Sequence, residues 1–262
     1  NFASAYPDQV PQSGFIAFLR FYTLLRRDSW AFTYFDRDAG RALIDPLVDR
    51  LRTLGGEIQL GARVTNLTRQ GECWNVAWSD GQATAPHIIL ALDAPGARIL
   101  LESSPDTAST ADSLTWPLTI PTAVLRFWFK TAPRVRAEAG ICTGDFTIDN
   151  FFWLDRFQPK FSAWREATGG GVIETHIYGP SETLAQPDAV LLARALVDVQ
   201  RIWPAVRGEM LAQSIRRNPA THTLFGTAGS SLGVETAWPD MAACGDWVRF
   251  PHPSLYLSLI HI

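Results

Sequence analysis

The stretch that decides the fold prediction is residues 49–67, DRLRTLGGEIQLGARVTNL. Apolar residues at helical spacing run from residue 42 to 54, and the Gly55-Gly56 pair that follows them is typical of a helix end. Glu57–Leu60 and then Ala62–Leu67 alternate between polar and apolar residues, which predicts two short strands. The chain is therefore expected to pass from a helix into a sheet.

The next forty residues extend this sheet. Cys73–Trp78 alternates in the same way, and Ser79-Asp80-Gly81 is a turn sequence that favours a hairpin. His87–Leu92 is a continuous apolar run, which predicts a buried strand. Ala94–Leu101 follows it as a predicted helix. This order indicates a β-meander, a buried strand and a covering helix.

A second sheet is predicted between Pro117 and Tyr178, where β-rich runs show little helical periodicity. Its strands are expected at 122–129, 146–153 and 172–178. The other predicted elements are helices at 15–27 and 189–202 and strands at 211–217 and 241–244. The adjacent aromatic residues at 127–129 and 151–153 must alternate between two faces of their strands, so one face of each could line an apolar tunnel and the other fill the core.

Composition excludes several classes of protein. The 262 residues carry a formal net charge of −3, with 47% hydrophobic and 19% charged residues, which argues against a disordered chain and a nucleic-acid binder. Three cysteines that lie far apart form neither a disulfide framework nor a zinc motif, and five histidines show no metal-ligand spacing. No apolar stretch approaches the roughly 20 residues of a membrane span. Ten Trp and fifteen Phe suit either an apolar ligand cavity or a ring-rich core.

A second motif lies near the C-terminal end, where an apolar strand leads into Cys244-Gly245-Asp246-Trp247-Val248-Arg249 and then Pro251-His252-Pro253. Together with residues 49–67, this motif resembles the flavoprotein superfamily of amine oxidases and phytoene desaturases. The resemblance implies an FAD cofactor that contacts Val64, Gly245, Asp246, Trp247 and Pro253. Glycine lets the backbone approach a ligand, and Asp246 could accept hydrogen bonds from ribityl hydroxyls.

The resemblance also implies a fold class and a domain division. We expect a mixed α/β (α+β) fold, with an incomplete FAD-binding Rossmann-like domain and an interleaved substrate domain of β-sheet plus helices. Helical substrate-domain residues would span 1–54, FAD-domain segments 55–102 and 236–256, and the main substrate-binding domain 103–235.

The chain departs from the family pattern at both ends. The Gly-x-Gly-x-x-Gly turn that binds the dinucleotide in this superfamily is absent. We therefore expect that a first βαβ unit precedes Asn1, and that the chain as given binds FAD poorly. Residues 257–262, LSLIHI, resemble the translation of a sequencing adapter and are left out of the fold prediction.

Segments such as Asp149–Leu154, Ile177–Pro180 and Arg217–His222 are most similar to the carotenoid branch of the superfamily. The resemblance implies an FAD-dependent oxidoreductase of a long apolar isoprenoid or carotenoid, working by desaturation, isomerisation or end-group chemistry. An amine or porphyrinogen oxidase and a non-catalytic isoprenoid-binding protein are the alternatives. No residue stands out as catalytic, and Glu174 receives no role. A cytoplasmic protein that touches a membrane surface is expected, without a nucleic-acid partner or a metal; its oligomeric state is open.

Overall fold

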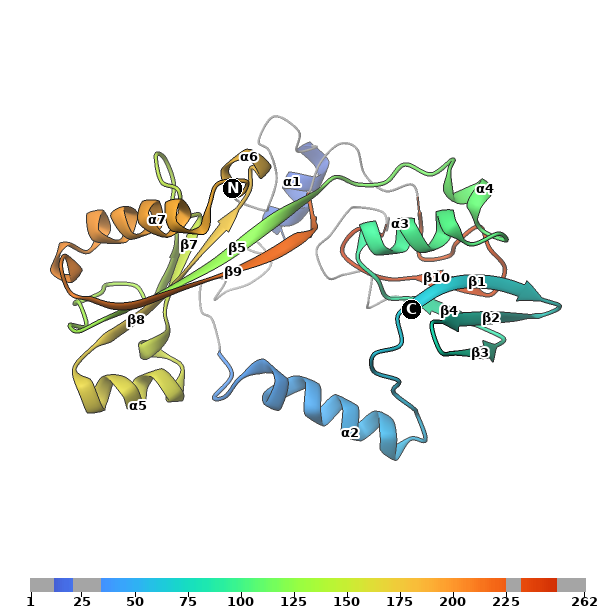
Figure 1. The fold of residues 1–262 in the computed structure, drawn as a ribbon, viewed down its shortest axis with the longest axis horizontal. Coiled ribbons are helices and arrows are strands. Elements are labelled where there is room, and N and C mark those ends of the chain that lie inside the picture. Colours follow the sequence, from blue (N-terminus) through green and yellow to red (C-terminus); the bar gives the residue numbers. More distant parts are fainter. Residues whose placement is uncertain (1–11, 21–33, 225–231, 249–262) are drawn as a thin grey trace. The chain divides into compact units, whose positions relative to one another are not determined.

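A computed structural model describes residues 12–20, 34–224 and 232–248, which form two compact units (Figure 1). We call residues 34–57 and 120–219 the sheet unit. Residues 12–20, 58–119, 220–224 and 232–248 form the meander unit. Within the described ranges the chain changes unit between residues 20 and 34 and again after residues 57, 119 and 219.

The predicted FAD-domain and substrate-domain boundaries after residues 54, 102 and 235 stay a prediction. Residues 103–119 join the meander unit through buried hydroxyl groups. Ser104 Oγ donates to the Leu100 carbonyl at 2.7 Å, and Thr107 Oγ1 donates to the Leu101 carbonyl at 2.6 Å. The backbone N–H of Leu67 donates to Ser104 Oγ at 2.9 Å, which ties this segment to the meander.

The sheet unit is built on five strands in the order β6-β7-β8-β5-β9. The pairs β5–β8, β6–β7 and β7–β8 are antiparallel. The strands are β5 (Thr119–Phe129), β6 (Ala139–Ile141), β7 (Asn150–Trp153), β8 (Gly171–Tyr178) and β9 (Met210–Thr223). The second sheet that the sequence predicts is thus present.

Helix α7 (Asp188–Ile202) covers one face of this sheet (Figure 1). Its buried residues Leu191, Ala195 and Val199 share a core with Phe127 and Ile173 of the strands. The predicted helix at 189–202 is confirmed. Pro204, separated from it by Trp203, is the first residue of the short helix η5 (Pro204–Val206). Smaller helices are η4 (Leu154–Arg156), α5 (Pro159–Thr168) and α6 (Ser181–Leu184).

The predicted helix of residues 42–54 is also present. A π-helical turn, η3 (Gly40–Ile44), leads into α2 (Asp45–Thr53), and Gly55 ends it with φ +83°. No residue of α2 is buried, and Leu47 and Leu54 are 57% and 67% exposed. The predicted strand at 57–60 is wrong. These residues are irregular, because Ile58 and Leu60 are exposed and pair with no strand within the described ranges.

The meander unit contains an antiparallel sheet of β1 (Val64–Gln70), β2 (Cys73–Trp78) and β3 (Gly81–Ala85). The predicted hairpin at 79–81 is confirmed by the pairing of Trp78 with Gly81. A second sheet pairs β4 (Ile88–Leu90) in parallel with β10 (Met241–Ala243), as Figure 1 shows. Helices α1 (Gln12–Leu19), α3 (Ala94–Ser103) and α4 (Ala108–Ala111) complete the unit.

The core of the meander unit joins segments that are far apart in sequence. Leu67, Trp74, Leu101 and Trp247 are buried together in it. The expectation of a fully buried strand at 87–92 is only partly met, since Leu90 is buried but Ile89 is 57% exposed. Because parallel strands are usually covered on both faces, the exposed Ile89 shows that one face of β4 is left uncovered by the described residues.

Helix α1 occupies the first part of the predicted helix at 15–27. Phe15, expected on a partly buried face, is exposed. The later part of that prediction falls in residues 21–33, which lie outside the described ranges. In the described part of the chain, no helix combines the length and the apolar character that crossing a bilayer requires.

Candidate functional site

The predicted cofactor turn lies at the carboxyl end of β10. Gly245 has φ +142°, and the backbone turns back so that the N–H of Val248 donates to the Gly245 carbonyl at 3.3 Å. A Cβ at this position would lie 2.9 Å from Nε1 of Trp247. Glycine is therefore required here for two reasons, the left-handed backbone and the indole beside it.

Trp247 holds this turn against the core. Its indole is 3% exposed, and Nε1 donates to the Leu92 carbonyl at 2.7 Å, just beyond β4. The ring also lies 5.6 Å from that of Trp116. These contacts tie the carboxyl ends of the two parallel strands together, and such ends are the usual place for a ligand in an open α/β sheet.

Asp246 presents a carboxylate next to this turn. Thr223 Oγ1 donates to its Oδ1 at 3.2 Å. Burial lowers the pKa of His222, and the negative charge of Asp246 opposes that shift. A carboxylate has two oxygens and about four acceptor sites, so Asp246 retains the capacity to accept hydrogen bonds from ligand hydroxyls.

Val64 is the first residue of β1 and pairs with Trp78. The register then shifts between Val64 and Asn66, which is a β-bulge. Oδ1 of Asn66 is buried and has no hydrogen-bond partner among the residues that the structure describes. Such an orphaned acceptor next to an irregular strand start is a place where a ligand donor would be stabilising.

The two predicted segments belong to one unit. Val64 packs against the same core that contains Trp247 and Val248. The described members of the predicted set thus include a carboxylate acceptor, a Cβ-free turn and a bulged strand start. The acceptor capacity of Asp246 and the turn without a Cβ fit the hydroxyl-bearing ribityl part of FAD. Pro253, the last member of the predicted set, lies outside the described residues.

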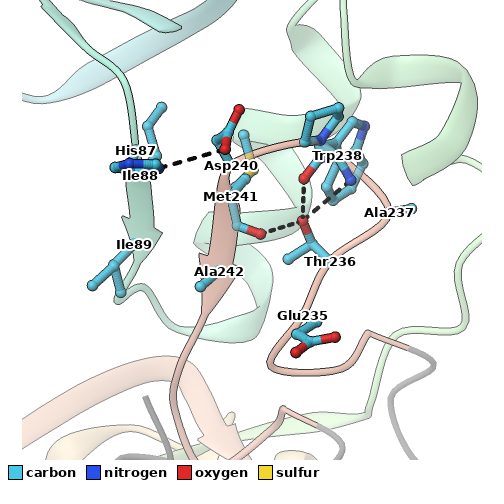
Figure 2. A pocket seen from close by; sticks show the side chains of 11 residues that line it. His87, Ile88, Ile89, Glu235, Thr236, Ala237, Trp238, Asp240, Met241 and Ala242 are labelled. Carbon is cyan, nitrogen blue, oxygen red and sulfur yellow. Dashed lines mark hydrogen bonds and ion pairs between the residues drawn. The ribbon is translucent and has the colours of Figure 1, made fainter. Parts of the chain in front are cut away.

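An open hollow of about 500 Å³ lies beside β4 and β10 in the meander unit (Figure 2). Figure 2 shows His87 and Ile89 on the β4 side, with Asp240 and Ala242 on the other side. Nδ1 of His87 lies 3.5 Å from Oδ1 of Asp240, and Thr236 Oγ1 donates to the Met241 carbonyl at 2.6 Å. The hydrogen bonds of Thr236 fix the loop that forms the wall.

Asp240 is already paired from the other side. Nη2 of Arg69 lies 2.9 Å from its Oδ2, and Nη1 of Arg69 donates to the Pro239 carbonyl at 3.1 Å. Trp74 Nε1 donates to the same carbonyl at 2.9 Å. Asp240 thus has its partners within the protein, whereas Nε1 of Trp238, which also lines the hollow, is buried without a hydrogen-bond partner among the described residues.

The sheet unit carries a polar cluster on the face opposite α7. Arg126 of β5 donates from Nε to Oε2 of Glu174 at 3.1 Å, and its Nη2 also contacts that oxygen. His176 Nε2 lies 3.1 Å from Oε1 of Glu174. Burial alone would raise the pKa of Glu174, but the hydrogen bonds from His176 and Arg126 outweigh it and hold this pKa below its usual value.

Tyr178 continues the cluster along β8. Its hydroxyl lies 2.9 Å from Nδ1 of His176, and Nδ2 of Asn150 donates to it at 3.3 Å. The backbone N–H of Tyr178 donates to Oδ2 of Asp149 at 2.7 Å. Burial raises the pKa of Asp149, which the bond from Tyr178 opposes. A line of hydrogen bonds therefore runs across three strands.

The aromatic residues divide between the two faces. Phe127, Phe129 and Trp153 are fully buried in the core under α7. Phe152 lies on the other face, where its ring centroid is 5.2 Å from that of His176. On the same face, the ring centroid of Trp128 lies 5.9 Å from Cζ of Arg126. The face with the polar cluster is thus the one with aromatic side chains outside the core.

Sequence reasoning missed this cluster, although a signal was present. Glu174, His176 and Tyr178 are spaced two apart in a predicted strand, and period two places them on one face. The partners Arg126 and Asn150 could not be found in this way, because their place opposite β8 depends on the strand register.

Comparison with known proteins places this geometry in a wider context. The chain is 25% identical over 136 residues to the carotenoid phi-ring synthase of Chlorobaculum tepidum, a match that covers 51% of this chain and 21% of that protein. Cyclohexylamine oxidase from Brevibacterium oxydans has a similar fold, with a TM-score of 0.62 at 11% identity, covering 96% of this chain and 57% of that one.

A protein named Putative protoporphyrinogen oxidase, from Exiguobacterium sp. 255-15, is similar with a TM-score of 0.61 and 17% identity, over 95% of this chain and 58% of that one. This chain therefore spans little more than half the length of these structural neighbours. The family model for flavin-containing amine oxidoreductases matches residues 8–254. With both the fold and almost the whole sequence in agreement, the chain belongs to the flavin-containing amine oxidoreductase family.

Proposed function

We propose that the protein is an FAD-dependent oxidoreductase that acts on a long apolar isoprenoid or carotenoid, by desaturation or by related hydride-transfer or end-group chemistry. The observation that carries this proposal is the family match over residues 8–254 together with the carotenoid phi-ring synthase relative. The Gly245-Asp246 turn at the end of a parallel strand supports FAD as the cofactor in this proposal, because a carboxylate acceptor and a turn without a Cβ suit a flavin nucleotide.

In this proposal the meander unit holds the cofactor. Asp246 accepts hydrogen bonds from ribityl hydroxyls, the backbone at Val64 faces the adenine, and Gly245 leaves room for close approach. Trp247 acts by fixing the turn, through its hydrogen bond to Leu92, and Pro253 belongs to the loop that follows. When bound, FAD supplies the acceptor for a hydride from the substrate.

The substrate class is supported by the aromatic side chains outside the core of the sheet unit. Trp128 and Phe152 offer flat apolar surface on the face that also carries the polar cluster. An amine or porphyrinogen oxidase is the second candidate, and the structural similarity to cyclohexylamine oxidase favours it. The third candidate is a non-catalytic isoprenoid-binding protein, for which no flavin chemistry is expected.

We also propose that the protein works in the cytoplasm and contacts a membrane surface, where isoprenoid substrates reside. The exposed leucines of α2 and its flanks support this, since Leu47 and Leu54 present apolar side chains to solvent. Binding of the protein to phospholipid vesicles with and without Leu47→Glu measures this contact. Equal binding by both proteins would contradict it.

The test of the enzymatic proposal uses the complete protein, purified with FAD. Anaerobic addition of a carotene should bleach the flavin absorbance, whereas an aliphatic amine should leave it unchanged. Bleaching by the amine alone would support the second candidate. A purified protein that gains no flavin absorbance with added FAD would overturn both oxidoreductase readings.

A further inference from the structure

We propose that Thr223 is a positioning residue of the cofactor site, whose buried hydroxyl orients the carboxylate of Asp246 for the ribityl hydroxyls of FAD. This inference rests on the proposed function and adds a residue to its cofactor site. Both residues belong to the meander unit, so the arrangement is complete within one unit. Thr223 acts through Asp246 and not by contact with the flavin.

The meander unit holds Thr223 in a fixed place. Thr223 is the last residue of β9, and its side chain is buried, with 7% of the residue exposed. The backbone N–H of the next residue, Leu224, donates to the Leu118 carbonyl at 2.8 Å. Because the neighbouring backbone is bonded and the side chain is buried, the hydroxyl donates from a defined position.

The acceptor of this hydroxyl is the carboxylate in the turn after β10. Oγ1 of Thr223 lies 3.2 Å from Oδ1 of Asp246. The backbone around Asp246 is fixed as well, because the N–H of Val248 donates to the Gly245 carbonyl at 3.3 Å. Asp246 itself is half-buried, so it remains accessible to a ligand. The turn therefore places the carboxylate, and Thr223 sets its rotation.

A neutral donor suits this role better than a cation would. A carboxylate has about four acceptor sites, and the Thr223 hydroxyl occupies one of them. The negative charge of Asp246 stays in place, and hydrogen bonds to a charged acceptor are stronger than those to a neutral one. His222 does not cancel this charge at neutral pH, because burial lowers the pKa of its imidazole and the charge of Asp246 offsets that shift only in part.

The orientation of the carboxylate before binding has a consequence for affinity. A group that is already fixed loses less rotational freedom when the ligand binds. Thr223→Val replaces the hydroxyl with a methyl group and keeps the branched shape, so Asp246 is free to rotate toward water. We expect this variant to bind FAD about tenfold more weakly. Its melting temperature should change little, because water can reach the half-buried carboxylate.

The test is a fluorescence titration of the complete apoprotein with FAD and with FAD analogues that each lack one ribityl hydroxyl. In the unchanged protein, the analogue without the hydroxyl that Asp246 binds should have about tenfold lower affinity than FAD. In Thr223→Val this preference for FAD should fall to about twofold, because the freely rotating carboxylate no longer favours that hydroxyl. Thr223→Ser keeps the donor and should restore both the affinity and the preference.

Thr236→Val is the matched control. Thr236 is also in the meander unit, and its hydroxyl donates to the Met241 carbonyl at 2.6 Å, at the amino end of β10. Loss of this hydroxyl should lower the melting temperature and leave the preference for FAD over the analogue intact. If Thr223→Val shows this same pattern, Thr223 has a structural role only and the inference is wrong.

The remaining outcomes separate the role of Thr223 from the proposed function. If the unchanged protein binds FAD, and Thr223→Val binds it equally well or loses affinity for FAD and all analogues by one factor, the positioning role is wrong and the proposed cofactor stands. The same holds if no analogue binds more weakly than FAD to the unchanged protein. If the unchanged protein binds no FAD, the proposed function is wrong and the role of Thr223 falls with it.

Discussion

At the scale of single residues, Gly245 shows how a motif position can serve the fold as well as a ligand. Its φ of +142° and the 2.9 Å separation between a Cβ and Trp247 Nε1 both exclude a side chain. The turn cannot keep Trp247 bonded to the Leu92 carbonyl once that space is filled. The glycine thus connects the end of β10 to the end of β4.

We predict that Gly245→Ala lowers the free energy of unfolding by about 2–4 kcal/mol, from backbone strain and the displaced indole. Thermal or urea unfolding measures it. Gly71→Ala is the matched control, since Gly71 also has a positive φ, +63°, but an added Cβ meets nothing within 4 Å. Gly71→Ala should lower the free energy of unfolding by about 1–2 kcal/mol. Equal losses would show that the contact with Trp247 contributes nothing.

Asp246 gives a prediction about the cofactor. Asp246→Ala should weaken FAD binding about tenfold or more, because hydrogen bonds to a charged group are worth roughly 1.5–3 kcal/mol each. Fluorescence titration of the complete apoprotein with FAD measures the change. Asp80→Ala, in the exposed hairpin turn between β2 and β3, serves as the comparison and should bind FAD normally. Unchanged binding in Asp246→Ala would remove this residue from the site.

At the scale of elements, the β5–β8 pair predicts a pH effect on stability. The pKa of Glu174 is lowered in the folded protein, so its ionised form stabilises the fold above the unfolded value, and this stability is lost as pH falls through the folded pKa. Glu174→Gln should therefore destabilise the protein at neutral pH and show a smaller loss of stability on acidification below about pH 4.5. Parallel curves for both proteins would contradict the linkage.

Element type was largely predictable from the sequence where the pattern was local. The helix at 189–202 and the hairpin at 79–81 depend on periodicity and turn chemistry within a few residues, and both are present. Strand formation at 57–60 depends on a partner elsewhere, and the alternation alone was misleading there. The predicted burial of Ile89 is wrong for a similar reason, because burial depends on which other elements cover the strand.

The site was predictable only in part. The Gly245-Asp246 turn is a local motif, so its place after a strand could be predicted, and β10 bears that out. The cluster around His176 combines three strands, β5, β7 and β8, whose register is fixed by the packing of their apolar faces against α7. A single sequence gives the alternation within β8 but not which residue of β5 or β7 lies opposite.

At the scale of the whole molecule, the described residues form two separate hydrophobic cores, one in each unit. We predict that Leu191→Ala, in the core under α7, destabilises the sheet unit by about 3 kcal/mol. Hydrogen exchange should show faster exchange in β5 and β8, with β1 and β2 unchanged. Val197→Ala, on the exposed side of α7, is the control and should change neither the stability nor the hydrogen exchange of the sheet unit. Equal acceleration in both units would indicate one cooperative core.

The interleaving of the two units has a consequence for synthesis of the protein. A ribosome that has made β4 must go on to translate all five strands of the sheet unit before it delivers β10, the parallel partner of β4. During that interval Trp74 and Leu90 lack the neighbours Trp247 and Met241 that complete their core. Of the two described units, the meander unit can therefore complete its core only after the five strands of the sheet unit have been synthesised.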